Sequence, residues 1–93
     1  MKYCEGLAYG NINSCAKGVG SFFAKYARVD LVKVMENCKT FESQEGQQGC
    51  IFGIVRQKML SGSLVNEIEV ECERTPDGKW AGICKVAVSQ YGT

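Results

Sequence analysis

Six cysteines, spaced as three close pairs, are the strongest constraint on how this chain can fold. The close pairs are Cys4 with Cys15, Cys38 with Cys50, and Cys72 with Cys84. An even number of cysteines in a chain of only 93 residues is typical of a disulfide framework in a secreted or periplasmic protein. We therefore expect each close pair to form a disulfide that closes one local loop, although six cysteines allow fifteen pairings.

A second interpretation of the same cysteines stays open. Reduced cysteine behaves as a small buried hydrophobic residue, which is how cytoplasmic proteins use it. The chain begins Met1-Lys2-Tyr3, and no apolar signal segment follows. We expect a secreted or periplasmic protein if the thiols are paired, and a cytoplasmic one if Met1 is the native start and the thiols are free.

The cysteine spacing also raises the question of an internal repeat. Cys4, Cys38 and Cys72 are 34 residues apart, and Cys15, Cys50 and Cys84 follow at steps of 35 and 34. A threefold repeat would produce such spacing. The segment after Cys15 has a helical pattern, however, whereas the segment after Cys50 has the composition of a strand. We therefore expect the regular spacing to be coincidental.

The first half of the chain predicts helices. Residues 1–10 are expected to form an N-terminal arm or an edge strand, and residues 11–41 to be helical. The helical pattern consists of apolar residues three and four positions apart: Ile12, Cys15, Ala16, Val19, Phe22, Phe23, Tyr26 and Ala27, then Leu31, Val34, Met35, Cys38 and Phe41. One long bent helix and two short helices both fit this pattern. Residues 42–49 are polar and contain two glycines, which predicts a loop.

The second half predicts strands. Residues 50–60 are rich in Ile, Phe and Val, and residues 67–73 alternate glutamate with Ile, Val and Cys. Thr75-Pro76-Asp77-Gly78 has the composition of a hairpin turn, and residues 79–89 then predict a last strand. We expect one α+β domain over residues 1–93, in which the helices pack on a three- to four-stranded antiparallel sheet and residues 50–91 form its meander.

The alternating segment would place four like charges on one strand face, namely Glu67, Glu69, Glu71 and Glu73. Arg56 and Lys58 on the preceding strand, with Lys79 and Lys85 on the following one, are placed to form cross-strand ion pairs with them. A solvated, charge-paired sheet face is one interpretation of this row. The other is an acidic surface that binds a basic partner.

The residue types that support catalysis or metal binding are scarce. The chain has no histidine, so Ser-His and Cys-His pairs are excluded, and a zinc site would need four cysteines from distant segments. It also lacks Cys-x-x-Cys, a Walker sequence and an apolar run of the ~20 residues that a membrane span needs. The net charge of +1 gives no electrostatic reason to expect nucleic acid. We predict a non-enzymatic protein without metal, cofactor, nucleic-acid partner or membrane span.

These exclusions leave binding as the predicted function. We expect a small protein that acts as an inhibitor or an effector by binding another protein. The candidate binding surface is the predicted turn and the glutamate row: Pro76, Asp77, Gly78, Lys79, Trp80, Glu67, Glu69, Glu71 and Glu73. Trp80 is either an interface anchor or a core residue. One alternative is a sugar- or ligand-binding module that uses Trp80. Another is a structural subunit that docks through residues 42–49 or a free sheet edge. The oligomeric state stays open.

Overall fold

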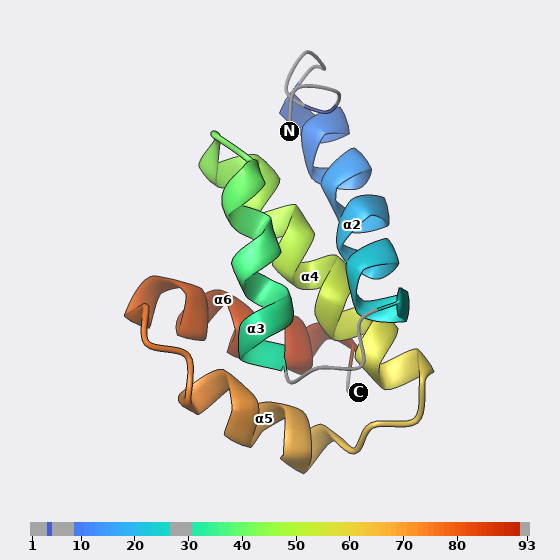
Figure 1. Ribbon diagram of the computed structural model, residues 1–93, viewed down its shortest axis with the longest axis vertical. Coiled ribbons are helices and arrows are strands. Elements are labelled where there is room, and N and C mark those ends of the chain that lie inside the picture. Colours follow the sequence, from blue (N-terminus) through green and yellow to red (C-terminus); the bar gives the residue numbers. More distant parts are fainter. Residues whose placement is uncertain (1–3, 5–8, 27–30, 92–93) are drawn as a thin grey trace.

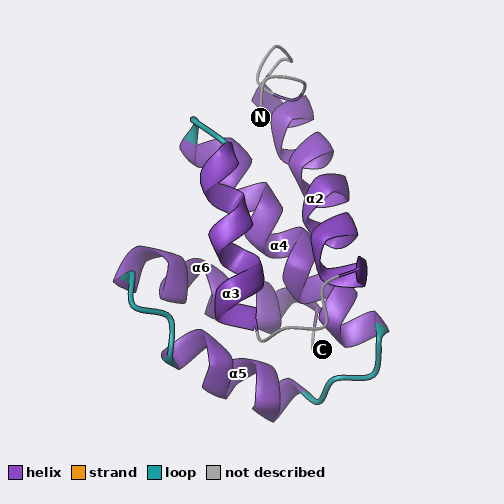
Figure 2. Cartoon of the chain, viewed as in Figure 1, coloured by secondary structure: helices purple, strands orange, loops and turns teal. Residues whose placement is uncertain are grey.

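The computed structural model describes residue 4, residues 9–26 and residues 31–91, and every regular element in these parts of the chain is a helix (Figures 1 and 2). The elements are α2 (Tyr9–Tyr26), α3 (Leu31–Met35), the 3₁₀ helix η1 (Glu36–Thr40), α4 (Gln44–Leu60), α5 (Val65–Glu73) and α6 (Gly78–Tyr91). The helices expected within residues 11–41 are present. The expected α+β fold with an antiparallel sheet is wrong, because the segments predicted as strands are α4, α5 and α6.

Helix α4 lies at the centre of the molecule. It packs along α2 and also contacts α6, α3 and η1 (Figure 1). All residues from Gly49 to Val55 are buried, so this stretch is apolar on every side. A helix that is enclosed on all sides needs no polar face, and its sequence therefore shows no 3.6-residue period. This is why residues 50–60 have the composition of a buried strand.

The predicted loop at residues 42–49 is also wrong. Ser43 is the N-cap of α4, and its Oγ accepts a hydrogen bond from the Gly46 amide at 3.0 Å. The helix then includes residues 44–49, with Gly46 and Gly49 buried. The docking elements of the predicted structural subunit were a loop at residues 42–49 and a free sheet edge. Residues 44–49 are instead helical, and the described residues contain no sheet.

Two glycines allow the backbones of α2 and α4 to approach closely. A Cβ atom on Gly20 would overlap the carbonyl oxygen of Cys50, and one on Gly53 would overlap the carbonyl oxygen of Lys17. The Ser21 hydroxyl donates a hydrogen bond to the Gly53 carbonyl at 3.1 Å across the same contact. The glycines therefore serve helix–helix packing, which outweighs their low helix propensity.

Helices α5 and α6 replace the predicted last hairpin. In α5, Ile68 and Cys72 are buried four positions apart, whereas Val70 between them is 56% exposed. This is the pattern of one helix face and not of strand alternation. Glutamate is also a good helix former and is depleted in strands. The expected cross-strand ion pairs between the glutamates and Arg56, Lys58, Lys79 and Lys85 have no sheet on which to form.

The buried face of α6 likewise follows the helical period. Its buried residues are Trp80, Cys84, Ala87 and Val88. Val86, which the alternation of a strand would place on the same face as Trp80, Cys84 and Val88, is 51% exposed. The segment Thr75-Pro76-Asp77-Gly78 does change the direction of the chain, but it connects two helices (Figure 1).

Three disulfides join the cysteines in the pairing that their spacing favours: Cys4–Cys15, Cys38–Cys50 and Cys72–Cys84. The second links η1 to α4, and the third links α5 to α6. The segments after Cys15 and after Cys50 are both helical, so the expected difference between them, which spoke against an internal repeat, is absent. Of the predicted arm or edge strand at residues 1–10, only residues 4, 9 and 10 are described, and all three are helical.

The core forms where α3, η1, α5 and α6 meet the central helix. Its largest fully buried side chains include Phe41, Leu31, Met35, Ile51, Ile54 and Ile68. Cys4, Cys38, Cys50, Cys72 and Cys84 are also fully buried. None of the helices in the described parts of the chain is long and apolar enough to cross a membrane.

Candidate binding site

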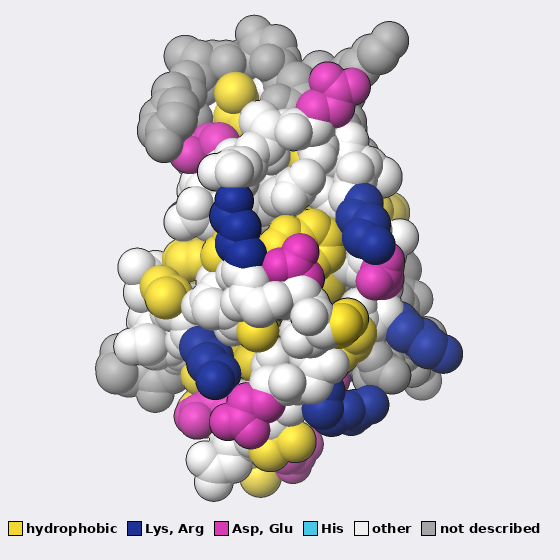
Figure 3. Space-filling model, turned by 90° about the vertical axis from the view of Figure 1, so that its left-hand side faces the viewer, with side chains coloured by type: hydrophobic (Ala, Val, Ile, Leu, Met, Phe, Trp, Pro, Cys, Tyr) yellow, Lys and Arg dark blue, Asp and Glu magenta, His cyan; other side chains and the backbone are white. Residues whose placement is uncertain are grey.

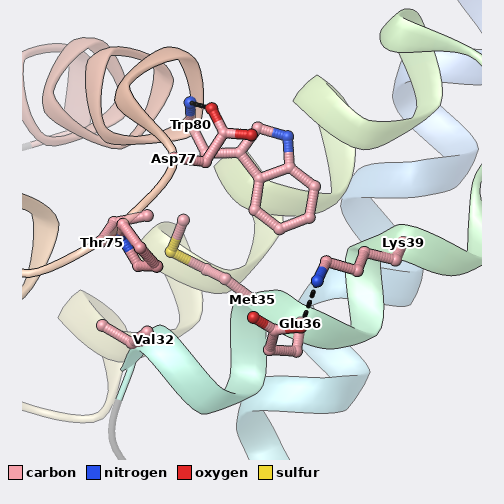
Figure 4. A pocket seen from close by; sticks show the side chains of 8 residues that line it. Val32, Met35, Glu36, Lys39, Thr75, Asp77 and Trp80 are labelled. Carbon is pink, nitrogen blue, oxygen red and sulfur yellow. Dashed lines mark hydrogen bonds and ion pairs between the residues drawn. The ribbon is translucent and has the colours of Figure 1, made fainter.

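A pocket opens between α3–η1 and the segment that connects α5 to α6 (Figure 4). Its volume is about 290 Å³. One wall consists of residues from α3 and η1: Val32, Met35, Glu36 and Lys39. The other wall consists of Thr75, Pro76, Asp77 and Trp80. The first set recurs at three- and four-residue steps, which places all four on one helical face.

The second wall is fixed by the start of α6. Asp77 Oδ1 accepts hydrogen bonds from the backbone amides of Lys79 at 2.9 Å and Trp80 at 3.2 Å. This is N-terminal capping, in which a carboxylate satisfies amides that have no partner within the helix. The Thr75 side chain is buried, and its hydroxyl donates to the Glu71 carbonyl at 3.3 Å. Both ends of the connection are thus tied to the adjoining helices.

Trp80 lies between the pocket and the core. It is only 8% exposed, and its indole N–H donates a hydrogen bond to Gln47 Oε1 at 3.3 Å. The Gln47 amide nitrogen in turn donates to the Phe41 carbonyl at 2.9 Å. A buried indole normally finds such a partner for its N–H. The same ring therefore belongs to the core and forms part of the pocket wall.

An ion pair lies at the other wall of the pocket. Lys39 Nζ and Glu36 Oε2 are 2.7 Å apart, three positions from each other along η1 (Figure 4). Their side chains are 65% and 52% exposed, respectively. Exposed pairs of this kind are weak because water and salt screen them. The pair therefore contributes little to stability, and both side chains are accessible to a ligand.

The structure separates the predicted binding surface into three parts: residues that line the pocket, residues beside the pocket, and the glutamates of α5. Pro76, Asp77 and Trp80 line the pocket, and Gly78 and Lys79 are exposed beside it at the start of α6.

The glutamate row lies on α5 and does not form one face. Glu67, Glu69 and Glu73 are exposed. Glu71 is half-buried, and its Oε2 accepts a hydrogen bond from the Leu31 amide at 2.6 Å. Glu71 thus links α5 to the start of α3 and is not part of a free acidic surface.

Several residues of the site were missed from the sequence. Val32, Met35, Glu36 and Lys39 lie 41 to 48 residues before Trp80 in the chain, and Gln47 falls within the predicted loop. The sequence analysis included only Met35, as part of the apolar helical stripe. The three- and four-residue spacing of the first four could have indicated a common helix face, but not the segment that covers it.

The surface around the site mixes residue types. Figure 3 shows the side of the molecule on which α3 and the connection between α5 and α6 lie in Figure 1. Hydrophobic side chains are visible there among side chains of both charges. Charge complementarity alone therefore does not define a partner for this side.

The described residues offer little for covalent or metal chemistry. All six cysteines are in disulfides, so no thiol can act as a nucleophile or a metal ligand. No group of three or more cysteine, aspartate or glutamate side chains in the described parts of the chain is arranged to hold a metal ion. The pocket with Trp80 is therefore the feature on which we base a function.

Comparison of the chain with protein-family models, with curated proteins and with solved structures gave no match.

Proposed function

We propose that this protein is a small non-enzymatic binding protein that acts on another protein, as an inhibitor or an effector, through the pocket beside Trp80. The observation that carries the proposal is the pocket itself, with a tryptophan in its wall. Binding energy at protein interfaces concentrates where an anchor residue enters a well-packed, water-excluding pocket, and tryptophan is enriched at such sites.

The position of the pocket between two disulfide-linked helix pairs supports the proposal. One wall includes η1, which the Cys38–Cys50 bridge joins to α4. The other wall includes the start of α6, which the Cys72–Cys84 bridge joins to α5. A site held by cross-links on both sides is formed before the partner arrives. Such a site loses less conformational entropy on binding than a flexible one.

The disulfides also support a proposal for the compartment. Disulfides form and persist in oxidising environments and are rare in the cytosol. With all six cysteines bridged, we propose that the protein works outside the cytoplasm, as a secreted or periplasmic protein.

Peptides selected on the oxidised protein from a displayed random library test the proposal, with the pocket obstructed in one variant. Val32 lines the pocket and is half-buried, so Val32→Phe adds bulk to it without removing a buried group. We expect the selected peptides to bind this variant at least about tenfold more weakly, which corresponds to ~1.4 kcal/mol.

Val86→Phe is the matched control, because Val86 is an exposed valine of α6 that does not line the pocket. Binding to this control should equal binding to the unmodified protein. The proposal is wrong if the selected peptides bind the Val32 and Val86 variants equally well, or if no pocket-dependent peptide emerges.

A further inference from the structure

We infer that the pocket takes an uncharged, apolar side chain, either branched aliphatic or aromatic, in preference to a sugar or a charged side chain. This inference rests on the proposed function for the source of the side chain, a partner protein. It names the chemistry of the ligand, which the proposed function leaves open.

The polar groups of the pocket walls are already engaged within the protein. The indole N–H of Trp80 donates to Gln47, and the hydroxyl of Thr75 donates to the Glu71 carbonyl. Asp77 Oδ1 accepts two backbone amides of α6. A sugar-binding site needs several free donors and acceptors that orient hydroxyl groups. Thr75, Trp80 and Asp77 Oδ1 would first have to give up bonds that hold their wall together, and the accessible side chains of Glu36 and Lys39 lie only on the opposite wall.

The larger part of the pocket lining surface is apolar. Val32 contributes aliphatic surface from one wall, and Pro76 and the small exposed part of Trp80 contribute aliphatic and aromatic surface from the other. Met35 also lines the pocket but is only 1% exposed (Figure 4). An apolar side chain placed between the two walls would bury hydrophobic surface against both of them, which is favourable at ~25 cal/mol per Å².

The charges at the pocket do not favour one sign of ligand charge strongly. Glu36 and Lys39 neutralise each other, and Asp77 is exposed, so its carboxylate stays hydrated. A charged side chain that entered the pocket would lose hydration and find no buried partner of opposite charge. An apolar side chain has no such penalty.

The size of the pocket fits one side chain. Its volume of about 290 Å³ is just below the range of roughly 300–1,000 Å³ that is typical of small-molecule sites. An oligosaccharide or a large cofactor would extend far beyond it. A leucine- or phenylalanine-sized group fits within this volume, and the apolar part of the lining favours it over polar groups of similar size.

Side-chain analogues test this inference without knowledge of the partner. The probes are the N-acetyl amides of leucine, phenylalanine, lysine and glutamate, together with methyl α-glucoside, titrated into the oxidised protein and followed by ¹H–¹⁵N NMR. The indole N–H of Trp80 is a unique reporter, because the chain has one tryptophan. We expect the leucine and phenylalanine amides to shift this resonance and the amides of residues 75–80, with affinities at least about fivefold higher than those of the other probes, or ~1 kcal/mol.

Two obstructing variants and one control show whether the probes bind in the pocket. Val32→Phe should abolish the shifts, and Val86→Phe should leave them unchanged. Because Val32 is half-buried, Glu36→Phe offers a second obstruction from an exposed lining residue. Near-ultraviolet circular dichroism and the mass of the oxidised protein show whether each variant is folded and bridged.

Each contrary outcome points to a different error. Tighter binding of the lysine amide would mean that Asp77 and Glu36 select a cation, and tighter binding of the glucoside would mean a sugar module. Either result, or no shift with either apolar amide, overturns the inference. The peptide selection tests the proposed function separately, since pocket-dependent peptides with a basic anchor would uphold the proposed function and contradict the apolar ligand.

Discussion

Helices α4 and α5 are held in the molecule in opposite ways. Helix α4 is enclosed, with every residue from Gly49 to Val55 buried. Helix α5 buries only Ile68 and Cys72, and its exposed side carries Val70 and most of its glutamates. The middle of α4 is fixed by packing on every side, whereas α5 depends on a few specific contacts. Stability should therefore differ between the two regions.

The difference bears directly on the pocket. The segment that follows α5 supplies one wall, and η1, bridged to α4, supplies part of the other. The site thus lies at the boundary between a firmly packed region and a more weakly held one, with a disulfide on each side. The substitutions below test whether the two regions differ in this way.

The largest effect is expected at the contact between α2 and α4. In Gly53→Ala, the new Cβ would overlap the carbonyl oxygen of Lys17, so the two helix backbones must separate. We expect a loss of about 3 kcal/mol in the free energy of unfolding, at the upper end of typical overpacking effects. Urea denaturation of the oxidised protein measures it.

Gly18→Ala on α2 is the control, because a Cβ at that position meets nothing within 4 Å. This variant should be more stable than the unmodified protein by up to about 1 kcal/mol, owing to the higher helix propensity of alanine. If Gly53→Ala and Gly18→Ala changed the free energy of unfolding equally, the backbones of α2 and α4 would not be in close contact at Gly53.

A smaller effect is expected where α5 is attached. Glu71→Ala removes the carboxylate that accepts the Leu31 amide and leaves that amide without its partner. Hydrogen bonds to charged groups contribute about 1.5–3 kcal/mol, and we expect a loss near the lower value because Glu71 is only half-buried.

Glu69→Ala provides the matched comparison on the same helix, since Glu69 is exposed. Its effect should stay within about 0.5 kcal/mol, as is usual for surface positions. If Glu69→Ala destabilises the protein as much as Glu71→Ala, the bond from Glu71 to α3 does not hold α5 in place.

The sequence predicted the features that depend on local spacing. The disulfide pairing followed from three close cysteine pairs, and the helices within residues 11–41 followed from apolar residues three and four positions apart. The turn around Asp77 was also predicted, but as a connection between two strands and not as the cap of a helix. Each of these signals lies within a dozen residues and needs no knowledge of the rest of the fold.

Predictions that depended on what surrounds a segment were wrong. Helix α4 shows no apolar stripe because neighbours cover all of its sides, and its glycines resemble a loop until α2 is placed against them. Helix α5 alternates perfectly in sequence, yet Val70 is exposed and Ile68 is buried. The helical spacing of Ile68 and Cys72, and the preference of glutamate for helices, were the signals available against a strand.

The site could be predicted only in part for the same reason. Pro76, Asp77 and Trp80 were identified because a turn beside a tryptophan is recognisable in sequence. The opposite wall, with Val32 and Met35, comes from a distant segment that local patterns cannot pair with them. A pocket between elements is a property of tertiary packing.

Amide hydrogen exchange, resolved by NMR for α4 and α5 of the oxidised protein, tests most directly the claim that these are a buried central helix and a weakly held outer helix. We predict that the amides of residues 50–55 exchange only through global unfolding, with an opening free energy equal to that from urea denaturation. The amides of α5 should open at least about 2 kcal/mol more easily, through local unfolding. Equal protection of the two segments, or strong protection of alternate residues in 67–73 as in an edge strand, would contradict the account.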